Sequence, residues 1–202
     1  DVAVSDMQIM ASLDINFLKK HHSTISRASA IVVDTNLEKE TLMYLAKAYP
    51  GRMFVDTVST SKAQKIADIT GAFYTIIANR QEAELLSDIA INTINDAQIA
   101  IQHLLSRGTG MVLIGLGHEG VAYGTADEIG HFSLKNITSV NTTGAGDAFL
   151  AAMVCASLKQ IEMPRAIQLA SIASYLTLKA EKTISGELTW ENLETTLKEF
   201  KL

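Results

Sequence analysis

Residues 141–149 combine a glycine-rich turn with a carboxylate, and this pairing suits chemistry on a bound anion. The stretch reads Asn-Thr-Thr-Gly-Ala-Gly-Asp-Ala-Phe and passes directly into an apolar run that predicts a helix. Glycine lets a backbone turn tightly, and the start of a helix offers unpaired N–H groups and a positive dipole end to phosphate. Asp147 is predicted in the first helical turn, beside this anion hole. The alternative interpretation is a plain helix start, in which Asp147 only complements the dipole.

A second carboxylate, Glu82, is predicted just after a strand, in a stretch Asn-Arg-Gln-Glu that opens a helix. Ligands of open α/β sheets bind at the C-terminal ends of the strands. Magnesium keeps several of its waters and takes few direct carboxylates, so a glutamate at such a place suits a magnesium–phosphate network. The spacing is also typical of a capping box, which alone would explain Glu82. The presence of residues 141–149 later in the chain favours the interpretation of Glu82 as part of a magnesium–phosphate network.

Residues 115–120 spell Gly-x-Gly-x-x-Gly after a predicted strand, which is the first half of a dinucleotide-binding fingerprint. That fingerprint requires a helix next, whereas residues 121–124 predict a strand. The stretch therefore predicts a strand–turn–strand unit, with a plain hairpin turn as the alternative. An NAD-dependent oxidoreductase is a further alternative that rests on these residues alone.

The elements that must position these residues alternate between strands and helices. Apolar runs and periodicity predict them, with Ile99, Ile101 and Leu104 as core candidates of one helix. The alternation indicates a mainly parallel sheet covered on both faces, in one domain spanning residues 1–202. The predicted strands are 30–33, 53–55, 73–78, 111–116, 121–124 and 129–134, and the predicted helices are 14–26, 37–49, 61–70, 80–88, 96–107, one from residue 144, 163–180 and 190–200.

The composition is that of a globular protein and argues against several function classes. The chain has 202 residues, 48% hydrophobic and 19% charged, with a net charge of −5 and no basic run, which argues against a nucleic-acid partner. No apolar run reaches the length of a membrane span, and no signal peptide is visible. The single cysteine, Cys155, excludes an internal disulfide and is predicted to be a buried, inert thiol. We expect a cytoplasmic protein; a homodimer is compatible with the sequence.

Residues 141–149 resemble the signature Asp-Thr-Thr-Gly-Ala-Gly-Asp-x-Phe of the PfkB (ribokinase-like) carbohydrate and nucleoside kinases, with Asn at the first position. The resemblance implies a ribokinase-like three-layer α/β/α sandwich, whose N-terminal strands and lid are missing here. It implies that Asp147 is the catalytic base when a substrate hydroxyl attacks the γ-phosphate of ATP. It also implies that the N–H groups of Gly144, Ala145 and Gly146 hold the charge on the transferred phosphoryl group.

The resemblance extends to the other two motifs. Asn79 and Glu82 match the family's Asn-x-x-Glu, whose Asn lies near the ATP phosphates and whose Glu organises Mg²⁺, often through water. Gly117 and Gly120 match a Thr-x-Gly-x-x-Gly turn that lines the nucleotide site. Gly115 stands where Thr is usual in that turn, so one side-chain contact to ATP is in doubt.

Three further positions take a role from the resemblance alone. Ser171 matches a position near the adenine, although a core-facing or solvated serine is an equal alternative. Asn141 and Thr143 match residues beside a monovalent-cation site, which implies K⁺ there. Because the amide of Asn141 carries no formal charge, we expect a weaker dependence on that cation.

Residues 34–37, 55–59 and 181–185 are most similar to the pseudouridine kinase branch of the family. The implied reaction is phosphorylation of the 5′-hydroxyl of pseudouridine by MgATP. Two alternatives stay open. One is a sugar kinase similar to ribokinase or fructokinase. The other is a truncated, non-catalytic nucleotide-binding remnant, because the resemblance covers only the C-terminal two thirds of the family.

Overall fold

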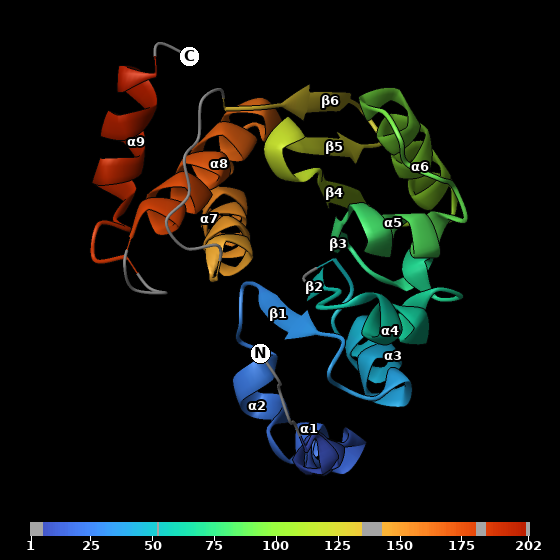
Figure 1. Cartoon of the computed structure of the whole chain (residues 1–202). Helices are drawn as coiled ribbons and strands as arrows, with labels where there is room; N and C mark the ends of the chain where they lie inside the picture. Colours follow the sequence, from blue (N-terminus) through green and yellow to red (C-terminus); the bar gives the residue numbers. More distant parts are fainter. Residues whose placement is uncertain (1–5, 52, 135–142, 181–184, 201–202) are drawn as a thin grey trace. The chain divides into compact units, whose positions relative to one another are not determined.

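The computed structural model describes residues 6–51, 53–134, 143–180 and 185–200, and within these ranges the strands form one sheet. Its order is β1-β2-β3-β4-β5-β6 (Figure 1). Strands β1 to β4 pair in parallel, with Val33, Val55, Ile76 and Val112 in register across them. The bounds are β1 Ile31–Asp34, β2 Met53–Asp56, β3 Thr75–Asn79, β4 Met111–Gly115, β5 Val121–Thr125 and β6 Ile129–Phe132. The four parallel strands confirm the predicted mainly parallel sheet.

The helices lie between the strands, as the alternation predicts. The predicted helix 61–70 is shorter than expected, because α4 gives way to the 3-10 turn η2 after one turn. The α-helices are α1 Ile15–Lys20, α2 His22–Ile25, α3 Lys39–Ala48, α4 Thr60–Ala63, α5 Arg80–Ser87, α6 Ile94–Ser106, α7 Ala145–Leu158, α8 Met163–Lys179 and α9 Trp190–Glu199. The 3-10 turns are η1 Gln8–Ser12, η2 Gln64–Ile66, η3 Thr70–Ala72 and η4 Gly117–Glu119.

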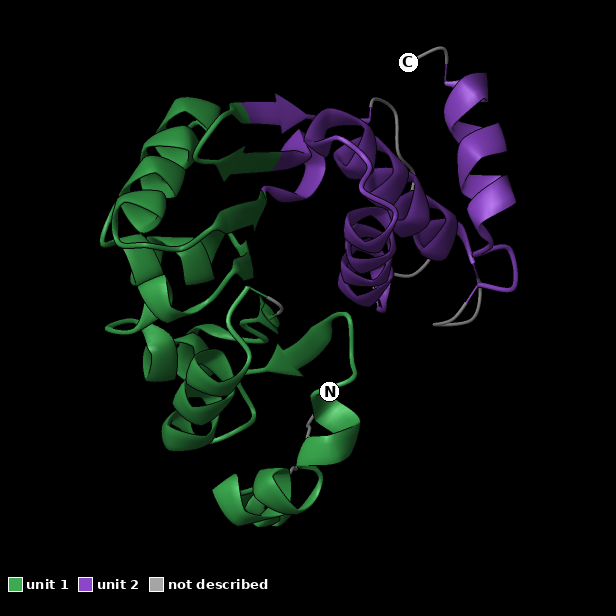
Figure 2. Cartoon of the chain, turned by 180° about the vertical axis from the view of Figure 1, so that it is seen from behind, with its two compact units in different colours: residues 1–115, 122–129 green, residues 116–121, 130–202 purple. Residues whose placement is uncertain are grey.

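The chain divides into two compact units, drawn in different colours in Figure 2. The first comprises residues 1–115 and 122–129, and the second comprises residues 116–121 and 130–202. Two compact units can belong to one domain, so the predicted single domain stays a prediction. In the described part of the chain, no helix combines the length and the apolar character that crossing a bilayer requires.

The first unit is built on the apolar strands and the helices packed against them. Helices α5 and α6 contact β3 and β4, and Figure 1 shows them along one face of these strands. Ile101 and Leu104 are fully buried, as predicted, and each contributes about 1.5–3 kcal/mol by leaving water. Ile99 was predicted to join this core, but it is 43% exposed. It lies two residues before Ile101, roughly 200° around the helix and therefore on the opposite face.

The second unit is centred on α7 and α8, which pack against each other. Small residues such as Ala156 and Ala170 are fully buried between larger ones, including Met153 and Ile167. This alternation of sizes allows the two helices to approach closely. The prediction of a buried thiol is wrong, because Cys155 is exposed in this structure. It lies just beyond the edge of the buried face that Ala148, Ala152 and Ala156 share.

Candidate active site

The N-terminus of α5 is closed by its own side chains. The Asn79 side chain accepts a hydrogen bond from the Glu82 N–H at 3.0 Å, and the Asn79 N–H donates to Glu82 Oε2 at 2.8 Å. A third bond joins Asn79 Nδ2 to Glu82 Oε1 at 2.7 Å. This reciprocal arrangement is the capping box that the spacing allowed. Glu82 is only 4% exposed, so the box fixes a buried carboxylate at the end of β3.

Thr57 adds a long-range contact to this carboxylate. It follows β2 directly, is fully buried, and its Oγ1 lies 2.5 Å from Glu82 Oε2 and 3.0 Å from the carbonyl oxygen of Ile77. Sequence analysis missed Thr57 as a site residue. The available signal was a hydroxyl side chain immediately after a buried strand, at the sheet edge where ligands of α/β folds bind.

The donor set around Glu82 fits a magnesium ion held through water. A carboxylate accepts at about four lone-pair positions. Three of them are filled by Thr57 and by the two donors of Asn79, and the described residues leave one position on Oε1. Within the described ranges, no group of three or more His, Cys, Asp or Glu side chains could enclose a metal. A single remaining acceptor position suits an ion that retains its own waters.

The N-terminus of α7 is open by contrast. Its N-cap is Gly144, with φ +86°, a left-handed conformation that glycine adopts without strain, and it supplies no capping side chain. The N–H groups of Ala145, Gly146 and Asp147 precede the first intrahelical bond. No acceptor for them is found in the part of the chain that the structure describes. Three N–H groups without an acceptor among the described residues, at a positive dipole end, suit an anion. They include those of Ala145 and Gly146 but have Asp147 in place of Gly144, and the predicted anion hole of Gly144, Ala145 and Gly146 stays a prediction.

Asp147 lies in the first turn of α7, as predicted, and its side chain is exposed. Among the described residues, none forms a hydrogen bond or ion pair with its carboxylate. The described residues do not require glycine at position 146, since a Cβ there would meet none of their atoms within 4 Å. A glycine that the fold does not need, beside free N–H groups, fits a place where a ligand approaches the backbone.

Helix α8 supports this turn through a residue that sequence analysis did not single out. The Ser174 hydroxyl donates to the Ala145 carbonyl oxygen at 2.8 Å, which ties α8 to the first residue of α7. Ser171 lies one turn earlier on α8 and is half-buried, so its predicted place near an adenine stays a prediction. Thr143 is exposed just before the helix, and Asn141 lies outside the described residues. The predicted monovalent-cation site therefore stays a prediction too.

The turn at residues 115–120 links β4 to β5 through η4, with the Leu116 N–H donating to the Gly120 carbonyl oxygen at 2.8 Å. No helix follows it, so the arrangement that holds pyrophosphate in a dinucleotide fold is absent from this described stretch. Gly120 requires glycine, because its φ is +93° and a Cβ would lie 2.1 Å from the Phe132 carbonyl oxygen. Gly117 also has a positive φ, of 66°, at the start of η4.

Gly115 pairs with Asn79 at the C-terminal ends of β4 and β3. In the first unit, the structure therefore brings Asn79, Glu82 and Gly115 to one edge of the sheet. The remaining described positions with a predicted role belong to the second unit: Gly117, Gly120, Thr143, Gly144, Ala145, Gly146, Asp147 and Ser171. That all of them line one cleft stays a prediction.

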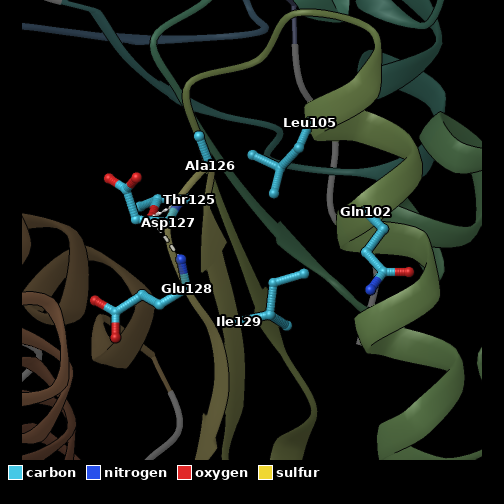
Figure 3. Close-up of a pocket in the computed structure, with 7 residues that line it drawn as sticks. All are labelled: Gln102, Leu105, Thr125, Ala126, Asp127, Glu128 and Ile129. Carbon is cyan, nitrogen blue, oxygen red and sulfur yellow. Dashed lines mark hydrogen bonds between the residues drawn. The ribbon is translucent and has the colours of Figure 1, made fainter.

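A separate hollow of about 360 Å³ lies between α6 and the loop that joins β5 to β6. Figure 3 shows its lining, with Leu105 and Gln102 on the helix side and Ile129 on the strand side. The carboxylates of Asp127 and Glu128 point away from the helix (Figure 3). Because it contains none of the predicted site residues and no basic side chain, this hollow is not suited to phosphate.

A family model described as pfkB family carbohydrate kinase matches residues 5–190. The chain is 30% identical over 194 residues to a pseudouridine kinase of Escherichia coli (strain K12), covering 95% of this chain and 62% of that protein. It is 25% identical over 183 residues to a guanosine-inosine kinase of Exiguobacterium acetylicum, covering 87% of this chain and 60% of that protein.

Among solved structures, the chain is similar to a Clostridium perfringens protein described provisionally as a sugar kinase. The TM-score is 0.90 and the identity 26%, over 98% of this chain and 63% of that one. The chain thus spans 60–63% of the length of these three proteins.

Proposed function

Because the chain belongs to the pfkB family of carbohydrate kinases, we propose that the protein transfers the γ-phosphoryl group of MgATP to the hydroxyl of a small molecule. The ribokinase-like α/β fold predicted from the sequence is confirmed by the structural similarity over 98% of the chain. The observation that carries the proposal is the open N-terminus of α7. There the N–H groups of residues 145–147, which have no acceptor in the described ranges, and the exposed carboxylate of Asp147 occur within one helical turn.

We propose pseudouridine as the substrate, phosphorylated at its 5′-hydroxyl. The support is the similarity to a pseudouridine kinase over 95% of the chain. Residues 34–37 and 55–59 also resemble the pseudouridine kinase branch of the family. A guanosine-inosine kinase is also similar, which favours a nucleoside over a free sugar. A ribokinase- or fructokinase-like sugar kinase is the second candidate, and the similarity to the provisional sugar kinase of Clostridium perfringens supports it.

Asp147 acts in this proposal as the base that orients the substrate hydroxyl. A carboxylate is a weak base, so it accepts the proton late, as the new bond from oxygen to phosphorus forms. Positioned proton transfer of this kind contributes about 10²–10⁴ in rate. Phosphoryl transfer otherwise depends on positioning and on stabilisation of charge. The N–H groups predicted for this role, those of Gly144, Ala145 and Gly146, together with that of Asp147, would supply that stabilisation on the protein side.

The remaining site residues would bind the nucleotide. Magnesium, when bound with ATP, neutralises charge on the phosphate oxygens. Asn79 and Glu82 would hold it through water, by the remaining acceptor position on Glu82 Oε1. The nucleotide would lie beside the turn that contains Gly115, Gly117 and Gly120. Its adenine would lie near Ser171. A potassium ion would bind beside Asn141 and Thr143. A cytoplasmic location suits an enzyme that consumes ATP, and a homodimer remains a prediction.

A phosphorylation assay on a substrate panel tests the proposal. The full-length protein is incubated with MgATP and pseudouridine, inosine or ribose, and product is identified by mass. We expect the highest kcat/KM with pseudouridine; a preference for ribose would favour the sugar kinase instead. Thermal unfolding of the 202-residue chain supplies an independent measurement, in which MgATP raises the melting temperature and NADH does not. Protection by MgATP without phosphorylation of any acceptor would indicate a nucleotide-binding protein without catalysis.

A further inference from the structure

We infer that Thr57 is a positioning residue that fixes the Glu82 carboxylate, so that one chosen oxygen faces the magnesium–phosphate network. The inference deepens the proposed function and rests on it. Thr57 comes from the end of β2 and Glu82 from the first turn of α5, 25 residues later, and the two side chains meet at 2.5 Å. Nothing in the local Asn-x-x-Glu pattern specifies this contact.

The Thr57 hydroxyl has one hydrogen and two acceptors within reach. The Glu82 Oε2 contact of 2.5 Å is much shorter than the 3.0 Å contact to the Ile77 carbonyl oxygen. Hydrogen bonds from a hydroxyl to a carboxylate are typically about 2.5–2.7 Å long, because the charge strengthens them. Thr57 therefore donates to Glu82.

This bond decides which carboxylate oxygen is available. Oε2 accepts from both Thr57 and the Asn79 N–H, so its lone pairs are filled. Among the described residues, Oε1 accepts only from Asn79 Nδ2 and keeps one position open. Without the Thr57 hydroxyl, Oε2 would regain a free lone pair, and both oxygens would then offer one position to a water of the metal ion. The capping box alone would hold Glu82 in place but would not single out Oε1.

The backbone around Thr57 is held firmly in the conformation that this contact needs. Its carbonyl oxygen accepts the Thr35 hydroxyl at 2.6 Å, and its N–H donates to the Ile77 carbonyl oxygen at 3.2 Å. The next residue, Val58, has φ +59°, which is unfavourable for a β-branched side chain. The Val58 N–H is held by Asp56 Oδ1 at 2.8 Å. Such strained conformations persist only where the surrounding contacts enforce them.

The competing explanation is that Thr57 is only a buried hydroxyl that stabilises the fold. Thr109 offers a matched control for this. It also lies in the first unit, is 4% exposed, and its hydroxyl donates to a backbone carbonyl, that of Thr70, at 3.0 Å. Thr109→Val therefore removes a comparable buried hydroxyl without touching Glu82.

The experiment measures the magnesium requirement of ATP binding in the 202-residue chain. At saturating ATP, Mg²⁺ is titrated and the rise in melting temperature is recorded for wild type, Thr57→Val, Thr57→Ser and Thr109→Val. We expect Thr57→Val to need about 10-fold more Mg²⁺ for half of the effect, since partners behind a metal ligand typically change metal affinity by about 10–100-fold. Thr57→Ser keeps the hydroxyl and should match wild type. Thr109→Val should lower the melting temperature while its Mg²⁺ requirement stays unchanged.

A Mg²⁺ requirement in Thr57→Val equal to that of Thr109→Val would overturn the inference and leave the proposed function intact. If wild type itself shows no MgATP protection, the proposed function fails first and the inference with it. Should Thr57→Val not fold, Thr57→Cys is the second variant, because a thiol is a weak donor of similar size. If Thr57→Cys needs more Mg²⁺ than wild type, even by less than about 10-fold, the inference is supported. If Thr57→Cys needs the same Mg²⁺ concentration as wild type, the inference is overturned.

Discussion

Helices α5 and α7 both carry a carboxylate at the third position of the helix, and they use it in opposite ways. In α5 the N-cap is Asn79, and Glu82 turns back to it, so the helix end is closed and the carboxylate is buried. In α7 the N-cap is Gly144, which offers no side chain, and Asp147 stays exposed over free N–H groups. The N-cap residue thus decides whether a helix start satisfies itself or remains open to a ligand.

The difference assigns different tasks to the two carboxylates. Glu82 has three hydrogen-bond donors around it and cannot move without breaking them, so it suits a fixed part of a binding network. Asp147 has no such partner among the described residues, so its carboxylate is available to a substrate. A carboxylate that takes a proton needs this freedom of access more than it needs burial.

Alanine substitutions at Glu82 and Asp147 should reveal the largest difference in stability between the two helix starts. Glu82→Ala removes the acceptor of the two Asn79 donors and the charged partner of the buried Thr57 hydroxyl, which keeps the Ile77 carbonyl oxygen within reach. We expect it to lower the free energy of unfolding by about 1–3 kcal/mol. Asp147→Ala removes only an exposed dipole partner and should cost about 0.3–1 kcal/mol. Urea denaturation of both variants measures this difference. Equal losses would show that the two helix starts are alike in stability.

Gly146→Ala should separate folding from ligand binding at α7. A Cβ at this position meets nothing within 4 Å, and alanine is the better helix former, so the free energy of unfolding should rise by about 0.5 kcal/mol. The same methyl group would obstruct a phosphate at the anion hole, and protection by MgATP should decrease. Melting temperatures with and without MgATP check both effects. A variant that is more stable and still fully protected would argue against close approach of the ligand.

Gly115→Thr should have a smaller effect and restores the residue usual in the family at this position. A Cβ on Gly115 meets only the Ala78 carbonyl oxygen, at 3.8 Å, so the strand end has room for it. We expect the free energy of unfolding to change by less than about 0.5 kcal/mol, as for other exposed substitutions. Isothermal titration with MgATP should show tighter binding if this turn lines the nucleotide site. Weaker binding would place the nucleotide elsewhere.

A third helix start, that of α6, is closed like that of α5 and supplies the smallest prediction. In α6, Asp96 accepts hydrogen bonds from the hydroxyl and the N–H of Thr93, and bonds from Thr93 and from the Asn92 N–H lower the pKa of Asp96. A lowered folded-state pKa gives stability that is present above the unfolded pKa, about 3.9, and lost as pH falls through the folded value. Wild type and Asp96→Asn should therefore differ at neutral pH and converge at acid pH, as measured by thermal unfolding. A difference that does not vary with pH would contradict this.

The sequence predicted those features whose cause is local. The turn before α7 and the position of Asp147 follow from neighbouring residues, as does the possible capping box at Asn79. Thr57 and Ser174 were missed because their contacts join distant segments, from β2 to α5 and from α8 to α7. Ile99 and Cys155 were placed wrongly because an apolar residue in a helix says little about which face it occupies.

The central claim, that Asp147 is the base of a phosphoryl transfer, is tested most directly by Asp147→Asn in the full-length protein. The amide keeps nearly the same shape but cannot accept the hydroxyl proton, so turnover with pseudouridine should decrease by roughly 10²–10⁴. ATP binding and the melting temperature should stay close to wild type. If Asp147 only complements the dipole of α7, the variant will instead lose about 0.3–1 kcal/mol of stability and keep its turnover. Wild-type turnover in Asp147→Asn would contradict the claim.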